Sequence, residues 1–289
     1  MKNHPLLTES NAVILERLAW CVLAPTIPFD GPQFFSSDNE KRLFWREVRA
    51  QFVADESYSR AQLQHRIEQL NSFRLGLLFE ALYAFMFELH PDYTIVAQNQ
   101  QLMDNGQTVG ELDLVLNHRI NARHYHIELA CKFYLEVQSI AGKSYWVGTN
   151  CRDRLDKKVA HLAQHQLQLS QRQPFLRSYD PPLESSALLR GCLFRPFDEL
   201  WTEASGAAVW ATSTMIKRWP QYAQLSALPL QKYQWLGLCS EQRPEHSLAE
   251  QLDQLERPTV LVLEPSAGAP NWVFWVPEHW PQTAVAALP

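Results

Sequence analysis

The chain has 289 residues, of which 46% are hydrophobic, and its formal net charge at pH 7 is −5. This length can bury one large core or a core with substantial additions, and the negative charge argues against a protein that coats nucleic acid without selectivity. No apolar run reaches the roughly 20 residues of a membrane span, and the N-terminal residues lack the apolar segment of a secretory signal. Together with five scattered cysteines and no C-x-x-C spacing, these features predict a soluble, cytoplasmic protein without a membrane partner.

The first ninety residues are expected to be helical, because apolar residues recur there at helical spacing. Four helices are predicted, over Asn11–Leu23, Asn39–Val53, Ala61–Leu70 and Arg74–Leu89. Ser37 or Asp38 can cap the second helix, and Pro91 ends the fourth. The fourth helix is apolar over most of its circumference, which is typical of a buried helix.

After Pro91 the pattern changes to strands. Alternation of apolar and polar residues predicts strands over Tyr93–Gln98, Gly110–Asn117 and Arg123–Val137. The run Asp104-Asn105-Gly106 predicts a turn between the first two. Asn150 can cap a further helix, whose apolar stripe runs from Leu155 to Leu169. The order between residues 74 and 170 is therefore helix, three strands, helix.

The chain after Pro181-Pro182 is rich in Trp, Pro and short apolar runs, which predicts an α+β subdomain or core extension. Strands are expected over Ala187–Phe194, Ala207–Thr212, Gln234–Leu238, Thr259–Leu263 and Asn271–Val276, with helices near Met215–Trp219 and Leu248–Leu255. The aromatic residues Trp272, Phe274, Trp275 and Trp280 could stack on bases, but alternating large residues in a late strand favour a core or a subunit contact. Homo-oligomerisation stays open. The expected organisation is a helical segment over 1–70, a core over 71–180 and the α+β part over 181–289.

Charged residues interrupt two of the central strands. Glu111 and Asp113 share one face of the second strand, and Glu128 and Lys132 share one face of the third. If these strands form a hairpin, Asp113 and Glu128 can lie opposite each other, where a hard divalent cation would relieve their repulsion. A bound Mg²⁺ can activate a water for attack on a phosphodiester, and Lys132 would orient that water or stabilise the phosphate. Alternation is equally typical of an ordinary half-exposed strand.

The segments GELDLVL (110–116) and HIELACKFYL (126–135) resemble the motif pair of the PD-(D/E)XK phosphodiesterases. More closely, the chain resembles a bacterial family known as domain of unknown function 1853, which is assigned to that superfamily, and the likeness continues through residues 148–170. The resemblance implies an α/β fold with an α-β-β-β-α-β nuclease-like core, N-terminal helices and a C-terminal α+β extension. It further implies a Mg²⁺- or Mn²⁺-dependent nuclease that hydrolyses DNA or RNA, with Asp113 and Glu128 as metal ligands.

One position departs from the superfamily's pattern. The usual lysine lies two residues after the acidic residue of the third strand, where this chain has Ala130. Lys132 is the nearest replacement and lies on the same face of the strand, about 7 Å further along. The alternative function is therefore a catalytically degenerate nuclease-like fold that binds nucleic acid or another protein.

Further candidates lie around this centre. Glu80 interrupts the apolar helix, and the resemblance implies an approach to the metal, although a salt bridge to Arg74 or Lys132 would also explain a charge there. Glu111 is a further ligand or an exposed residue, and Gln166 interrupts an apolar stripe and could reach the cleft. In the helix after Asn150, Arg154 and Lys158 could bind a phosphate backbone, whereas Asp153 and Lys157 have the spacing of a plain ion pair.

Overall fold

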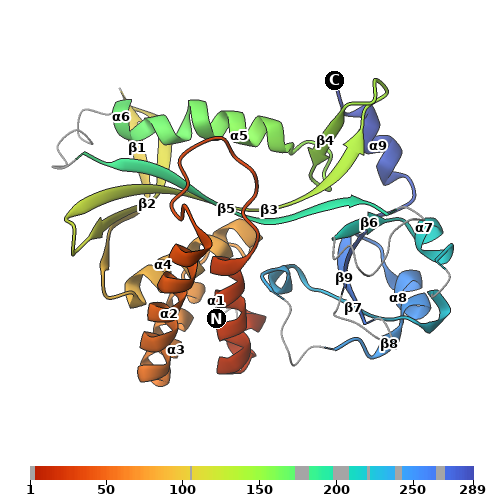
Figure 1. The fold of residues 1–289 in the computed structure, drawn as a ribbon, viewed down its shortest axis with the longest axis horizontal. Helices are drawn as coiled ribbons and strands as arrows, with labels where there is room; N and C mark the ends of the chain where they lie inside the picture. The colour runs from red at the N-terminus through yellow and green to blue at the C-terminus, as the bar shows by residue number, and fades with distance from the viewer. Residues whose placement is uncertain are drawn as a thin grey trace. The chain divides into compact units, whose positions relative to one another are not determined.

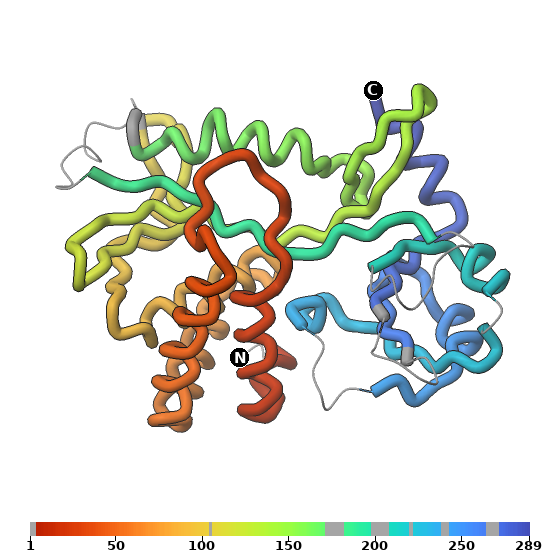
Figure 2. The backbone as a smooth tube through the Cα atoms, viewed as in Figure 1, coloured from red at the N-terminus to blue at the C-terminus, as the bar shows by residue number. Residues whose placement is uncertain are grey.

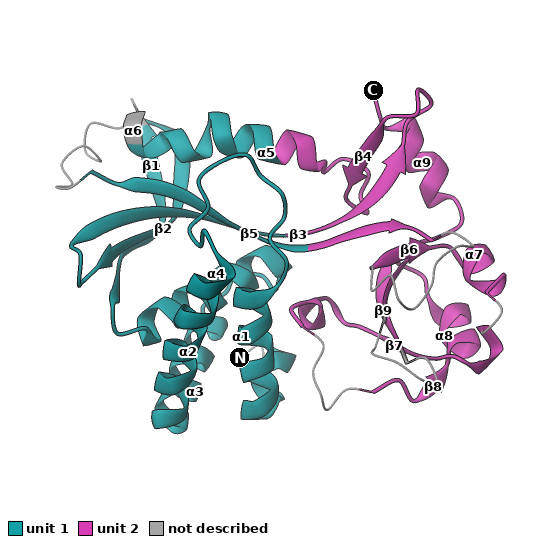
Figure 3. Ribbon diagram, viewed as in Figure 1, with its two compact units in different colours: residues 1–131, 159–191 teal, residues 132–158, 192–289 magenta. Residues whose placement is uncertain are grey.

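The computed structural model describes residues 4–104, 106–172, 182–197, 208–219, 222–237, 243–264 and 271–289. They form a mixed α/β fold (Figure 1) that divides into two compact units (Figure 3). The first unit holds residues 1–131 and 159–191, and the second holds residues 132–158 and 192–289. Because β3 (Arg123–Gln138), β5 (Glu184–Pro196) and α5 (Leu155–Gln164) contribute residues to both units, neither unit is one continuous stretch of sequence.

The predicted N-terminal helices are confirmed and belong to the first unit. They are α1 (Asn11–Leu23), α2 (Asp38–Ala54), α3 (Glu56–Glu68) and α4 (Leu75–Leu89), preceded by the short 3-10 helix η1 (Pro5–Thr8). The side chain of Ser37 caps α2 by accepting the Glu40 amide. α3 is longer than predicted, because Asp55 accepts the Tyr58 amide and starts the helix earlier. None of the described helices is both long and apolar enough for a bilayer crossing.

The strands of the first unit begin with two antiparallel pairings, β1 (Tyr93–Asp104) with β2 (Gln107–His118) and β2 with β3. β5 follows β3 in the strand order. Gly106 has a φ of +80°, as the predicted turn requires, while Asn105 lies outside the described residues. β1 extends beyond the predicted Gln98 because it pairs with β2 along its length.

The two faces of these strands carry different partners. On one face Tyr125 packs on Phe34, which in turn packs on Phe87 of α4. On the other face His126 and Glu128 point toward the segment formed by the 3-10 helix η2 (Gln166–Gln168) and α6 (Leu169–Arg172). Helix α4 is buried, as predicted: from Leu78 to Phe87 only Glu80 is partly exposed. One part of the apolar core therefore lies between α4 and the strands, and Leu102, Leu112 and Val115 form another part with Leu169 of α6.

The second unit contains a short strand that was not predicted, β4 (Ser144–Val147), which pairs with the end of β3. Its other strands are β6 (Val209–Ala211), β7 (Ser226–Pro229), β8 (His246–Ser247), β9 (Thr259–Glu264) and β10 (Asn271–Trp275). Its helices are α7 (Ser213–Lys217), α8 (Leu248–Gln254) and α9 (Trp280–Ala286), with the 3-10 helices η5 (Tyr222–Gln224) and η6 (Lys232–Trp235). The predicted helices near residues 215 and 248 and the strands near 209, 259 and 271 are confirmed.

Two predictions near this unit were wrong. In the strand expected over Gln234–Leu238, Gln234 and Trp235 belong to the helix η6, because Gln234 accepts the Gln231 amide and closes a helical turn. Leu236 and Gly237 follow the helix without regular structure, and Leu238 lies outside the described residues. Asn150 does not cap α5, because its side chain accepts the Arg152 and Asp153 amides in a turn before the helix.

The late aromatic residues are core residues. Phe274, Trp275 and Trp280 are buried, and the ring of Trp280 lies 5.4 Å from that of Trp210. The indole nitrogen of Trp275 donates to the Ser213 hydroxyl group, so a buried polar atom is satisfied. Base stacking by these three buried rings is therefore excluded, and Trp272 alone among the four is partly exposed.

Candidate functional site: a buried acidic centre on β3

The two predicted carboxylates directly follow the last paired residues of β2 and β3. Pairing runs from His118 opposite Arg123 to Leu114 opposite Ile127, next to Asp113 and Glu128. The ladder ends there, and the Oδ2 atom of Asp113 instead accepts the Leu129 amide at 2.8 Å. An amide that would otherwise lack a partner thereby orients the Asp113 carboxylate.

Glu128 is 2% exposed, and hydrogen-bond donors approach both of its carboxylate oxygens. The Nε2 atom of His126 lies 2.9 Å from Oε1, and Gln166 donates to Oε2. His126 sits two residues before Glu128 on the same strand face and is fully buried. The candidate Gln166 thus contacts Glu128, and η2 positions its side chain.

The polar contacts continue past His126. The Nδ1 atom of His126 lies 3.2 Å from the Ser185 hydroxyl oxygen of β5, which lies 2.5 Å from the Ser170 hydroxyl oxygen of α6. We call these five residues the Glu128 network: Gln166, Glu128, His126, Ser185 and Ser170. The Ser185 and Ser170 hydroxyl groups can each donate or accept, so the two nitrogens of His126 and both serines find partners within the network.

Sequence reasoning missed His126, Ser170 and Ser185. His126 was recognisable, because the face shared by Glu128, Ala130 and Lys132 extends back to it by strand alternation. Ser170 and Ser185 carried no such signal, since hydroxyl residues are common and only the packing of α6 and the pairing of β5 bring them to the histidine.

Lys132 belongs to the second unit and has a carboxylate partner there. Its ammonium nitrogen lies 2.6 Å from the Asp153 Oδ2 atom, and the Tyr134 hydroxyl group donates to Oδ1 at 3.0 Å. The predicted pairing of Asp153 with Lys157 is therefore wrong, because Asp153 precedes α5 and turns toward β3 instead. Burial, followed by the nearby Asp153 charge, raises the pKa of Tyr134, so its hydroxyl group stays protonated and donates.

The predicted phosphate-binding residues differ in their surroundings. Arg154 is 9% exposed, binds both oxygens of Asp156, and lies over the Tyr145 ring at 4.7 Å. Its hydrogen bond to Asp156 lowers the pKa of that carboxyl group. Lys158 is partly buried in the first turn of α5. A role of Arg154 in phosphate binding would require the release of Asp156.

Two acidic candidates remain. Glu80 is partly buried on α4, where its Oε1 atom lies 4.0 Å from the position that a Cβ atom on Gly76 would take. Glu111 is exposed on β2. Their roles as metal ligands stay predictions.

The carboxylates of Asp113 and Glu128 suit a cation that keeps most of its coordinated water molecules. Within the described residues no three His, Cys, Asp or Glu side chains are grouped to hold a metal ion. Mg²⁺, however, is commonly held by one or two carboxylates plus waters. Each carboxylate has about four lone-pair directions, and the donors described for Glu128 are His126 and Gln166.

Comparisons with known proteins assign the chain to a family. The model of the family described as domain of unknown function 1853 (DUF1853) matches residues 16–267. No match was found among the curated proteins or the solved structures with which the chain was compared. Because the matched residues span most of the sequence, the chain belongs to the DUF1853 family.

Proposed function

We propose that this protein is a divalent-cation-dependent phosphodiesterase that hydrolyses DNA or RNA through a centre built on Asp113 and Glu128, with a PD-(D/E)XK-like core. The observation that carries the proposal is the β2–β3 register, which ends at Leu114 opposite Ile127 and so brings Asp113 and Glu128 together at the end of the ladder. Residues opposite each other in an antiparallel pair have Cβ atoms about 5 Å apart. Carboxylates that directly follow such a pair can therefore reach one shared cation.

The burial of Glu128 supports a cation at this centre. A buried carboxylate, here 2% exposed, needs compensating positive charge or hydrogen bonds, and a bound cation would supply positive charge. A bound Mg²⁺ or Mn²⁺ would lower the pKa of a coordinated water and neutralise charge on the phosphate.

The chain's own residues hold the carboxylates in place. The Leu129 amide orients Asp113, while His126 and Gln166 orient Glu128. Such supporting contacts fix the direction of ligand lone pairs. Lys132 follows four residues after Glu128 on β3, and its assistance in catalysis requires release from Asp153.

The charge distribution supports a polyanionic substrate. Residues 111–177 contain ten Lys or Arg against six Asp or Glu, although the whole chain has a net charge of −5. A locally positive segment with a bound cation would attract a phosphate backbone, and this attraction would weaken as salt is raised.

A second function, a nuclease-like fold without catalytic activity, is favoured by one specific observation. The lysine nearest to the acidic residues is held by Asp153, and both Glu128 oxygens already have donors, so the arrangement is also stable without a cation. In that case the fold would serve to bind nucleic acid or another protein.

Calorimetric titration with Mg²⁺ and Mn²⁺ tests the proposal. The wild type is compared with the Asp113→Asn/Glu128→Gln double variant, and Glu68→Gln serves as the control because Glu68 is an exposed carboxylate on α3 and no candidate ligand. We expect saturable binding in the wild type and the control only, together with metal-dependent cleavage of single- or double-stranded DNA or RNA. Equal binding by the double variant would refute the centre, and binding without cleavage would favour the second function.

A further inference from the structure

A second polar site lies on the opposite face of the strands, around Arg190 of β5. This side chain is fully buried, and its Nη1 atom donates to the Thr26 hydroxyl group at 3.0 Å and to the Leu189 carbonyl group at 3.1 Å. Its Nε and Nη2 atoms are buried without a hydrogen-bond partner. Among the described residues no carboxylate lies within 4 Å of it. Buried guanidinium groups are almost always paired, so the two unsatisfied nitrogens indicate a missing partner.

The surroundings hold the guanidinium group firmly. The loop between α1 and α2 reaches β5, as Figure 2 shows, and Thr26 forms a bridge with Arg190 there. The guanidinium carbon lies 6.0 Å from the centre of the Phe35 ring. Tyr83 is close by as well: burial raises the pKa of its hydroxyl group, and the Arg190 charge opposes that rise. That hydroxyl group donates to the Cys21 carbonyl group at 2.8 Å.

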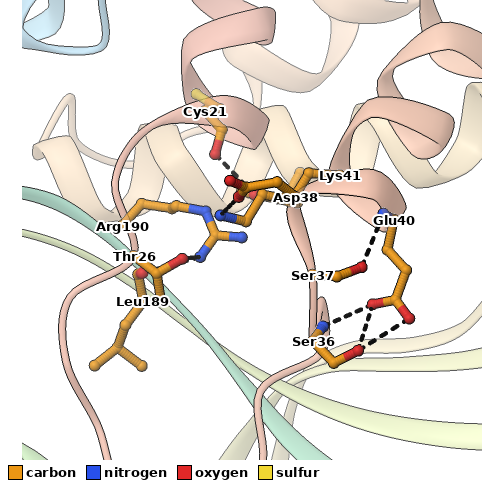
Figure 4. A network of polar contacts seen from close by, with 10 residues as sticks. Cys21, Thr26, Ser36, Ser37, Asp38, Glu40, Lys41, Leu189 and Arg190 are labelled. Atoms are coloured by element: carbon orange, nitrogen blue, oxygen red, sulfur yellow. Dashed lines mark hydrogen bonds and ion pairs between the residues drawn. The ribbon is translucent and has the colours of Figure 1, made fainter.

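A cavity of about 600 Å³ lies beside these residues. Its lining includes Thr26 and Phe35, which both contact Arg190, and Ser36, Ser37, Asp38 and Lys41 at the beginning of α2. Arg190 itself lies behind this lining, fully buried. In Figure 4 the guanidinium group lies between Thr26 and the side chains of Asp38 and Lys41. The N-terminus of this 17-residue helix adds a partial positive charge to the same cavity.

The buried charge beside the cavity is mainly positive. Lys41 is 8% exposed, and its ammonium nitrogen lies 2.9 Å from Asp38. Asp38 is the exposed member of that pair, with 73% of its side chain accessible, so it can rotate into solvent. The other carboxylate at the helix start, Glu40, is held by the amide and hydroxyl groups of Ser36. Arg190 and Lys41 are therefore two buried cations that face one exposed carboxylate that is free to leave.

We propose that this cavity binds a phosphate group, with Arg190 and Lys41 as its cationic ligands and the Thr26 and Ser37 hydroxyl groups beside them. A tetrahedral oxyanion satisfies several donors at once, which fits a guanidinium group with two unsatisfied nitrogens at a helix N-terminus. The site is independent of the proposed phosphodiesterase centre. Side chains alternate along β5, so Arg190 and Ser185 of the Glu128 network point to opposite faces.

Binding of inorganic phosphate, measured by calorimetry and by the shift in Tm against chloride of equal ionic strength, tests this proposal. We expect saturable binding by the wild type that is about tenfold weaker or absent in Arg190→Gln. Arg195→Gln is the matched control, since it removes the same charge from an exposed position of β5. Asp38→Asn should tighten binding, because it removes the carboxylate that competes for Lys41.

Two further comparisons complete the test. A nucleoside 5′-monophosphate that binds more tightly than inorganic phosphate would identify a phosphorylated organic ligand, and equal affinity would identify the free anion. If Arg190→Gln fails to fold, Lys41→Gln must show the weaker binding instead. Wild type without saturable binding, or undiminished binding by Arg190→Gln and Lys41→Gln, would overturn the proposal. Neither result depends on cation binding at Asp113 and Glu128, so the two sites can fail separately.

Discussion

A double-mutant cycle on His126 and Glu128 tests the Glu128 network. The two side chains are 0% and 2% exposed, and their contact is 2.9 Å long. His126→Leu leaves a buried carboxylate with one donor fewer, and a hydrogen bond to a charged group contributes about 1.5–3 kcal/mol. With the small cavity that Leu leaves, we expect the free energy of unfolding to fall by about 3 kcal/mol.

Glu128→Met removes the charge and leaves the imidazole N–H without an acceptor, which costs about 1–3 kcal/mol. In the double variant both partners are apolar, so neither is left unsatisfied. We therefore expect the double variant to lose about 2 kcal/mol less than the sum of the single losses. The hydrogen bond from Gln166 to Glu128 has little effect on this difference in stability, since the partly exposed Gln166 amide can bind water instead.

Urea unfolding, followed by tryptophan fluorescence and by far-UV circular dichroism, measures these free energies. The unfolding transitions reported by the two probes must coincide for a single free energy of unfolding to apply, because two units can unfold separately. Glu111→Met is the control, and we expect it to change stability by less than about 0.5 kcal/mol at its exposed position. Additive losses, within about 0.5 kcal/mol, would refute the contact between His126 and Glu128.

Three further predictions concern other parts of the fold. Gly110→Ala should destabilise the protein by about 1–3 kcal/mol in thermal unfolding, because a Cβ atom there would lie 2.6 Å from Leu169; an unchanged Tm would contradict this close packing. Ser37→Ala should lower stability by about 1 kcal/mol, as it removes the cap of α2, whereas Ser37→Thr should retain most of it. Since Arg154 lowers the folded-state pKa of Asp156, the stabilisation by Asp156 is present above the ordinary carboxyl pKa and is lost as pH falls through the lowered value. The stability difference between wild type and Asp156→Asn should therefore shrink on acidification, by a small amount because Asp156 is half exposed.

Local patterns predicted most elements of this fold. The cap at Ser37 and the proline after His90 gave the limits of α2 and α4, because helix ends depend on neighbouring residues. The alternation in Gly110–Asn117 and Arg123–Val137 predicted two strands, which pair as expected up to Leu114 and Ile127, next to Asp113 and Glu128. β4 escaped prediction, since four residues are too few for a periodic pattern.

The partners of the charged residues were decided by tertiary structure. Lys132, Asp153 and Arg154 all carried charges that several neighbours could match, and their choice of partner depended on the turn before α5. The division into two units also depends on tertiary contacts, since β3 and β5 each contribute residues to both units.

The sequence by itself determined which strands carry the carboxylates, because the alternation of apolar and polar residues that marks a strand is a property of the backbone. Only the tertiary structure decided that His126, Gln166, Ser170 and Ser185 surround Glu128, and that Arg190 is buried beside Thr26 with two nitrogens unsatisfied. These contacts join residues up to 164 positions apart. Local propensities carry no information on such pairs, since the packing of helices on strands is what brings them together.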